Sequence, residues 1–176
     1  MERFDLDSAI RKVKDFPREG ILFYDITGIL ANPKAFNYCI ESFYELYKDR
    51  DIDSIVCLEA RGFIFASPLA IKMGLPLVLA RKKGKLPGKT YERDFALEYG
   101  TDTICIQHID VKKGEKVLLI DDLVATGGTL EAARAIIEEN GATVEAIGGV
   151  IGLPFLGYQE LLKDHEVDVL LTYEGE

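Results

Sequence analysis

The 176-residue sequence has little of what several classes of protein require. Its three cysteines, Cys39, Cys57 and Cys105, are odd in number and widely spaced, which argues against a disulfide framework or a zinc site and favours buried, reduced thiols. No apolar run approaches the roughly 20 residues that a membrane helix needs, and the residues after Met1 have no apolar core like that of a signal peptide. We therefore expect a cytoplasmic protein with no membrane partner.

Basic residues are also in the minority. The chain has 21 Lys and Arg residues against 30 Asp and Glu residues, a formal net charge of −9, and this balance argues against nucleic acid as a partner. Taken alone, it also argues against an anionic small substrate. The positive charge is concentrated, however: residues 81–93 carry six basic groups and one acid, a local +5, so the other 163 residues sum to −14. The acidic total therefore says nothing against a polyphosphate ligand.

Apolar, β-rich runs alternate with segments of helical period, and the length and composition suit one domain over residues 1–176. The predicted strands are Ser54–Leu58, Leu75–Ala80, Lys116–Ile120, Val144–Ile151 and Val167–Leu171. The predicted helices are Phe36–Lys48, Phe63–Met73, Leu130–Asn140 and Gly157–Lys163. Strand–helix alternation implies parallel strands, so the sequence predicts an α/β fold with a parallel β-sheet flanked by helices. In such sheets, ligands bind beyond the carboxyl ends of the strands.

Two segments do not fit this alternation. Residues 1–35 form either a small hood over the end of the sheet or only an N-terminal arm. Residues 81–107 are polar, contain glycine and show little pattern; a connection of this length in a compact domain is usually a functional lid or a disordered insert.

The strongest chemical signal lies after the predicted strand that ends at Ile120. Asp121 and Asp122 follow that strand, and the short loop Ala125-Thr126-Gly127-Gly128-Thr129 then opens directly into a predicted helix. The two glycines allow the backbone to approach a ligand closely, and the loop amides, the helix N-terminus and the threonine hydroxyls can donate to an anion. The loop is therefore interpreted as a phosphate-binding loop.

The two aspartates need another partner, because a carboxylate beside a phosphate is unfavourable. Ribose hydroxyls can donate to carboxylates, and hydrated Mg²⁺ can bridge carboxylate and phosphate oxygens, so the combination indicates a sugar phosphate. Neither the Gly-Lys-Ser/Thr of a nucleotide P-loop nor the Gly-x-Gly-x-x-Gly of a dinucleotide site is present. The alternative is a strand–helix turn with a solvated acidic edge.

Residues 120–129 resemble the phosphoribosyl pyrophosphate signature of type I phosphoribosyltransferases. Four further segments, 16–27, 59–63, 81–88 and 97–100, resemble the adenine phosphoribosyltransferase branch, in the same order and with similar spacing. The resemblance implies a type I phosphoribosyltransferase-like fold with an N-terminal hood and a flexible lid loop. It also implies a homodimer that converts adenine and phosphoribosyl pyrophosphate to AMP and diphosphate, with Mg²⁺ held mainly by substrate and water.

The resemblance also implies roles for residues of the other motifs. The loop of Glu59, Ala60 and Arg61 would grip the diphosphate, and Arg61 offers a planar fork of donors for it. Arg81, Lys82 and Lys85 match basic positions of the mobile loop. Glu98 would be the catalytic carboxylate that meets the imidazole ring of the purine.

The base would lie against the hood. The candidates for contacting it are Leu22, Phe23, Tyr24 and Leu153, although Phe23 fits the core better. Many hoods of the adenine branch carry Arg or Lys where this chain has Tyr24, so the contacts at this position are open. The remaining alternatives are a phosphoribosyltransferase for a 6-oxopurine or orotate, and a regulator that binds the sugar diphosphate without turnover.

Overall fold

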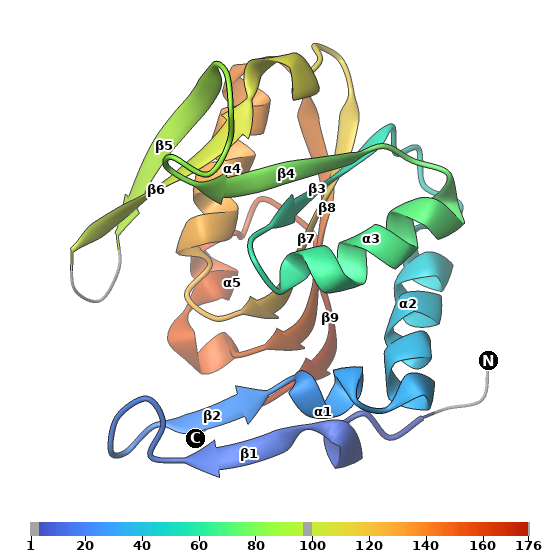
Figure 1. The fold of residues 1–176 in the computed structure, drawn as a ribbon, viewed down its shortest axis with the longest axis vertical. Helices are drawn as coiled ribbons and strands as arrows, with labels where there is room; N and C mark the ends of the chain where they lie inside the picture. The colour runs from blue at the N-terminus through green and yellow to red at the C-terminus, as the bar shows by residue number, and fades with distance from the viewer. Residues whose placement is uncertain (1–3, 97–99, 176) are drawn as a thin grey trace.

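The computed structural model describes residues 4–96 and 100–175. Within them a seven-stranded sheet has the order β5-β6-β4-β3-β7-β8-β9, and a separate two-stranded sheet pairs β1 with β2 (Figure 1). The strands of the large sheet are β3 (Ser54–Leu58), β4 (Leu77–Lys82), β5 (Thr90–Ala96), β6 (Thr101–Gln107), β7 (Lys116–Val124), β8 (Thr143–Gly152) and β9 (Val167–Thr172). The five predicted strands are thus confirmed, and they pair in parallel with one another.

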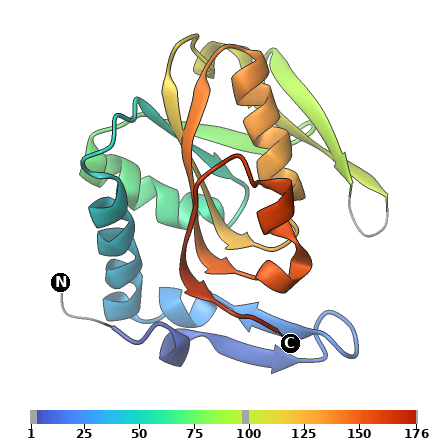
Figure 2. The same cartoon turned by 180° about the vertical axis from the view of Figure 1, so that it is seen from behind.

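Helices cover both faces of the large sheet (Figures 1 and 2). The helices α2 (Pro33–Tyr47) and α3 (Gly62–Met73) pack on one face, and α4 (Gly128–Glu139) and the short α5 (Tyr158–Leu161) pack on the other. In β7, Leu118 and Ile120 face the first of these cores, whereas Val117 and Leu119 face the second. Both sides of the strand are buried, which explains its unbroken apolar sequence.

Residues 81–107 differ from the expectation of an irregular lid or insert. β4 continues to Lys82, and β5 and β6 form an antiparallel hairpin at the edge of the sheet. Ile104 and Ile106 of β6 are buried in the core beneath α4. These two isoleucines lie on one face of the strand, and Cys105 on the other face is buried as well.

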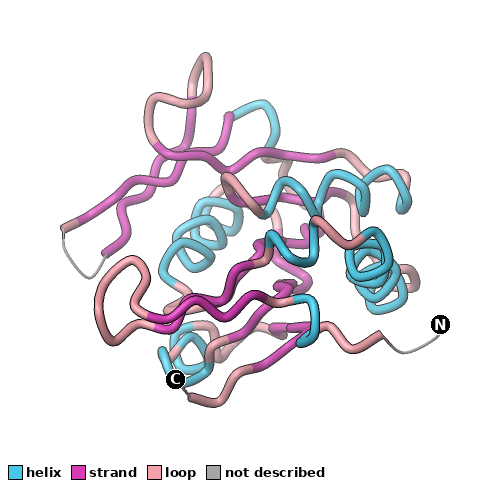
Figure 3. Tube along the Cα trace, turned by 60° about the horizontal axis from the view of Figure 1, so that its bottom comes forward, coloured by secondary structure: helices cyan, strands magenta, loops and turns pink. Residues whose placement is uncertain are grey.

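The N-terminal segment forms the hood, and the alternative of a loose arm is excluded. It contains β1 (Arg11–Lys14), β2 (Leu22–Asp25) and the short helix α1 (Thr27–Leu30), and it lies across the end of the sheet near the last residues of β9 (Figures 1 and 3). The hood therefore sits at the edge where the carboxyl ends of the parallel strands meet.

The structure also bears on the expectations for the cysteines and for membrane-spanning helices. The three cysteines are buried and free, as predicted. Among the residues that the structure describes, every helix is too short or too polar to cross a membrane.

Candidate active site

The carboxylate pair lies near the end of β7. The sequence predicted that this strand ends at Ile120. The strand instead runs through both aspartates to Val124, because its parallel pairing with β8 continues that far. Asp122 is only 5% exposed. Burial, reinforced by the neighbouring carboxylate of Asp122, raises the pKa of Asp121 well above its usual range, and burial also raises the pKa of Asp122. Two adjacent carboxylates at a buried position are costly unless a cation or a set of donors compensates them.

Arg61 supplies a cation for this pair. It directly precedes α3, and its Nε lies 2.8 Å from Oδ2 of Asp122, so that it works against the effect of burial on the pKa of that carboxyl. The Cζ of Arg61 also lies 5.9 Å from the ring centroid of Phe23 in the hood. The peptide bond between Glu59 and Ala60, just before Arg61, is cis. Arg61 therefore connects the β3–α3 turn with both the carboxylate pair and the hood.

The start of α3 approaches β7 closely at Gly62, so that a side chain at this position would crowd Asp121 and Ile120. A Cβ on Gly62 would lie 3.1 Å from Oδ1 of Asp121 and 3.1 Å from the carbonyl oxygen of Ile120. We expect Gly62→Ala to push the helix start away and to weaken the Arg61–Asp122 contact, at a cost of about 1–3 kcal/mol in the free energy of unfolding, as is typical of overpacking. Thermal unfolding would measure the loss of stability, and a crystal structure of the variant would show the position of Arg61. A variant with unchanged stability and an unchanged Arg61–Asp122 contact would contradict this description.

The segment Ala125–Thr129 has the geometry predicted for a phosphate-binding loop. Gly127 has a φ of +82°, in the left-handed region that favours glycine, and α4 begins at Gly128. The first amides of a helix have no partner within it and can donate to an anion. The loop lines a cavity of about 70 Å³ together with Asp121. The structure thus brings the loop and Asp121, the first carboxylate of the pair, to one cavity.

Two basic residues of the β4–β5 region, Arg81 and Lys82, are paired with acids. Arg81 Nη2 lies 3.1 Å from Oε2 of Glu59, and the backbone N–H of Lys82 donates to the other carboxylate oxygen of Glu59. The Lys82 Nζ lies 2.6 Å from Oδ2 of Asp102. The carbonyl oxygen of Lys85 accepts a hydrogen bond from Arg81, and the Lys85 side chain is exposed. The carboxylate of Glu59 therefore holds the Arg81 side chain and the Lys82 backbone in place.

Asp102 is a partner that the sequence reasoning missed. It lies on β6, and it reaches Lys82 only because β6 pairs with β4. Since residues 81–107 were not expected to form a hairpin, nothing indicated this contact. The alternation of apolar residues around Ile104 is the signal that could have revealed it.

The hood reverses the expectation for its two aromatic residues. Phe23, which was expected to fit the core, is half-buried and lies over Arg61, while Tyr24 is buried and stacks on Tyr173. Leu22 is partly buried against the core, and Leu153 is 7% exposed at the end of β8. Alternation along β2 explains the reversal, because consecutive side chains of a strand point to opposite faces.

The end of β5 lies beside the phosphate-binding loop. A Cβ on Gly128 would lie 3.6 Å from the carbonyl oxygen of Ala96 and 3.8 Å from Cδ2 of Phe95. These residues line a cavity of about 370 Å³ with Thr126 and the first turn of α4. Glu98, the predicted catalytic carboxylate, lies outside the described residues, two positions beyond Ala96.

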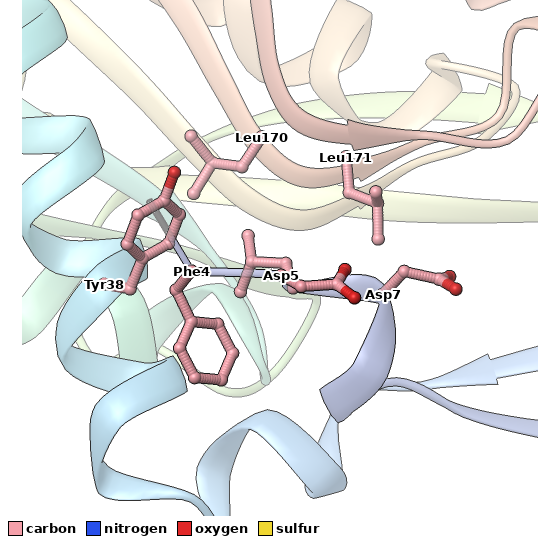
Figure 4. Close-up of a pocket in the computed structure, with 7 residues that line it drawn as sticks. Phe4, Asp5, Asp7, Tyr38, Leu170 and Leu171 are labelled. Atoms are coloured by element: carbon pink, nitrogen blue, oxygen red, sulfur yellow. The ribbon is translucent and has the colours of Figure 1, made fainter. Parts of the chain in front are cut away.

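A further cavity of about 470 Å³ lies between the N-terminal segment, α2 and β9 (Figure 4). Tyr38, Leu170 and Leu171 contribute to its walls, as do Asp5 and Asp7. None of the residues that line it belongs to the predicted site, so this cavity is separate from the one at the phosphate-binding loop.

Comparison with known proteins agrees with this arrangement. A family model described as phosphoribosyl transferase domain matches residues 25–151. The adenine phosphoribosyltransferase of Treponema denticola is 58% identical over 171 residues, which cover 97% of this chain and 90% of the relative. That of Marinomonas sp. is 44% identical over 175 residues, which cover 98% of this chain and 97% of the relative.

Solved structures give the same result. The crystal structure of adenine phosphoribosyltransferase from Thermoanaerobacter pseudethanolicus matches with a TM-score of 0.92 and 40% identity, covering 96% of this chain and 98% of that one. The Saccharomyces cerevisiae enzyme, in complex with an imino-altritol bisphosphate and adenine, matches with a TM-score of 0.89 and 38% identity, covering 94% and 96%. Because both kinds of match extend over nearly the whole chain, we conclude that it belongs to the adenine phosphoribosyltransferases, a branch of the phosphoribosyl transferase family.

Proposed function

We infer that this chain transfers the phosphoribosyl group of phosphoribosyl pyrophosphate to adenine, giving AMP and diphosphate, as a pentosyltransferase of purine salvage. The observation that carries the inference is that Asp121 lines one cavity with the Ala125–Thr129 loop, while its neighbour Asp122 forms an ion pair with Arg61. A ribose with a phosphate at one end and a diphosphate at the other needs acceptors for its hydroxyls and separate donors for its two anionic groups.

The carboxylates act on the sugar. The bond between the anomeric carbon and the diphosphate breaks ahead of bond formation to the base, which leaves an oxocarbenium-like ribose. Asp121 and Asp122 accept hydrogen bonds from the ribose hydroxyls, and their negative charge favours the positive charge that develops. The amides of Ala125–Thr129, with the hydroxyls of Thr126 and Thr129, bind the 5′-phosphate.

The leaving diphosphate is held by cations that must exchange partners. Arg61 contacts Asp122, Arg81 contacts Glu59, and Lys82 contacts Asp102. A diphosphate that enters between these groups replaces a carboxylate with a more highly charged anion, and the planar forks of the two arginines suit its oxygens. Lys85, whose side chain is exposed, adds charge without losing an ion pair that the structure records.

Mg²⁺ is the cofactor that we assign to this reaction. Among the described residues, no group of three or more His, Cys, Asp or Glu side chains is placed to hold a metal. Mg²⁺ commonly binds through one or two carboxylates, substrate oxygens and water, and Asp121 and Asp122 are the carboxylates that would contact it or its water shell. When bound, the ion supplies neutralisation of the diphosphate charge.

Glu98 manages the proton of the purine ring as the base attacks the anomeric carbon. Glu98→Gln is expected to lower kcat by roughly 10²- to 10⁴-fold, the usual contribution of such a group, while binding of phosphoribosyl pyrophosphate stays nearly unchanged. Single-turnover kinetics with a parallel titration of the sugar diphosphate would separate the two. Unchanged turnover would remove Glu98 from the mechanism.

The hood and Leu153 bind the base. Leu22 and Phe23 lie on the same strand, Phe23 is close to Arg61, and Leu153 stands at the end of β8. Assays in which adenine competes with hypoxanthine, guanine and orotate test this assignment. Preferential formation of AMP supports it, and preferential use of another base would replace adenine as the substrate.

We also assign the enzyme a homodimeric state, which the resemblance implies, and a cytoplasmic location. Apolar side chains on α2 and α3 are exposed, including Ile71 at 84% and Leu46 at 40%, and a second copy would cover such a surface. Light scattering of the purified chain would test the dimer, and a monomer at assay concentrations would contradict it.

A further inference from the structure

We propose that Tyr173 is a positioning residue for the base, because it ties the hood to the end of β8 and so fixes the two sides of the adenine site relative to each other. This inference rests on the proposed function and assigns a role to the tail that follows β9. It also gives a physical reason for Tyr24 at the position where related hoods often carry a basic residue.

The tie to the hood is an aromatic stack. The ring centroids of Tyr24 and Tyr173 lie 3.9 Å apart with an interplanar angle of 16°, and Tyr24 is only 7% exposed. The Tyr24 hydroxyl donates to the carbonyl oxygen of Gly175 at 3.3 Å, which adds a second contact between hood and tail. Such a buried aromatic pair stabilises by about 0.5–1.5 kcal/mol beyond its area.

Charged groups of the N-terminal segment hold Tyr173 from its other side. The Tyr173 hydroxyl donates to Oδ1 of Asp7, and the Nζ of Lys12 lies 2.8 Å from the same oxygen and 5.1 Å from the centroid of the Tyr173 ring. These hydrogen bonds, that of Lys12 first, lower the pKa of Asp7 and keep it ionised. Lys12 is the cross-strand partner of Tyr24 in the β1–β2 pair, so the contacts form one cluster.

The backbone of Tyr173 reaches the opposite side of the base site. The N–H of Tyr173 donates to the carbonyl oxygen of Gly152 at 3.1 Å. Leu153, which follows Gly152 in the chain, donates its own N–H to the carbonyl oxygen of Val124 at 2.9 Å. Phe23 is the neighbour of Tyr24 on β2 and points to the face of that strand where Arg61 lies. A displacement of Tyr24 therefore moves Phe23 relative to Leu153, and the distance between these two residues determines how a purine ring fits.

Three variants test the role, namely Tyr173→Leu, Tyr173→Phe and, as a control, Tyr44→Leu, which removes a partly buried tyrosine from α2. For Tyr173→Leu we expect the KM for adenine to rise roughly tenfold, as for other small misplacements. The KM for phosphoribosyl pyrophosphate should stay within about twofold, and Tyr173→Phe, which keeps the stack, should recover most of the loss. Hydrogen exchange of the β2 amides should be faster in Tyr173→Leu than in Tyr44→Leu.

The outcomes separate this proposal from the proposed function. If the wild-type chain makes no AMP from adenine, the proposed function fails, whereas the exchange rates at β2 still decide whether Tyr173 holds the hood. Unchanged exchange at β2 would overturn the tie itself. A parallel rise of both KM values, or the same selective rise in Tyr44→Leu, would show that Tyr173 contributes only to general stability.

Discussion

Replacing Asp121 and Asp122 together by asparagine is expected to lower kcat/KM by at least about 100- to 1,000-fold, the usual cost of losing one electrostatic contact to a transition state. Asp121 lines the cavity of the loop Ala125–Thr129, where the charge of an oxocarbenium-like ribose would develop, and Asp122 is its neighbour on β7. Asparagine keeps the size and the ability to accept hydrogen bonds but removes the negative charge. The fall should therefore appear in kcat more than in the KM for phosphoribosyl pyrophosphate.

The same carboxylates should reduce stability at neutral pH. An unfolded aspartate releases its proton near about pH 3.9, whereas burial raises the pKa of both groups in the folded chain. The folded state then binds more protons than the unfolded state, so stability falls as the pH rises from about 4 through the folded pKa values. Below that range both states are protonated and the cost disappears.

Asp121→Asn alone is therefore expected to raise the Tm at pH 7 and to leave it nearly unchanged at pH 4. Asp121 is the better choice for this measurement because Asp122 also holds Arg61. The exposed Asp164 provides a matched control, since Asp164→Asn removes the same charge at the surface. A variant with full activity, or one that loses stability at pH 7, would contradict the account of the pair.

Arg61→Ala is expected to have the second large effect. A hydrogen bond to a charged group contributes about 1.5–3 kcal/mol, so loss of the guanidinium should raise the KM for phosphoribosyl pyrophosphate by roughly 10- to 100-fold. Arg61 also opposes the effect of burial on Asp122, so its removal should raise the pKa of that carboxyl further and shift the acidic limb of the pH–rate profile upward.

Arg61→Lys is the matched control for this variant. It keeps the positive charge but loses the planar fork and the broad contact over Phe23, so it should lie between the wild type and Arg61→Ala. Rate measurements over a range of salt concentrations would show the charge component. If affinity for the sugar diphosphate does not change in either variant, Arg61 is an ordinary turn residue.

The turn at Ala125–Thr129 could be predicted from the sequence because its signals are local. Adjacent carboxylates, two glycines and a helix start within about ten residues leave few arrangements of the backbone. The structure reproduces that turn with Gly127 in a left-handed conformation and α4 beginning at Gly128.

Contacts between distant segments could not be predicted in this way. The pairing of Lys82 with Asp102 depends on the register of β4 and β6, and the stack of Tyr24 on Tyr173 depends on where the tail passes the hood. The positive charge of residues 81–93 can be counted from the sequence. The acidic partners of Arg81 and Lys82 depend on the tertiary structure. Which of Phe23 and Tyr24 is buried could not be predicted, because a strand of four residues has too little sequence to show which face is buried.

The most direct test of the central claim measures AMP formation from adenine and phosphoribosyl pyrophosphate with Mg²⁺, in competition with hypoxanthine, guanine and orotate. The account predicts that AMP and diphosphate form in equal amounts and that adenine is used in preference to the other three bases. Failure to form AMP, or faster use of another base under the same conditions, would contradict it.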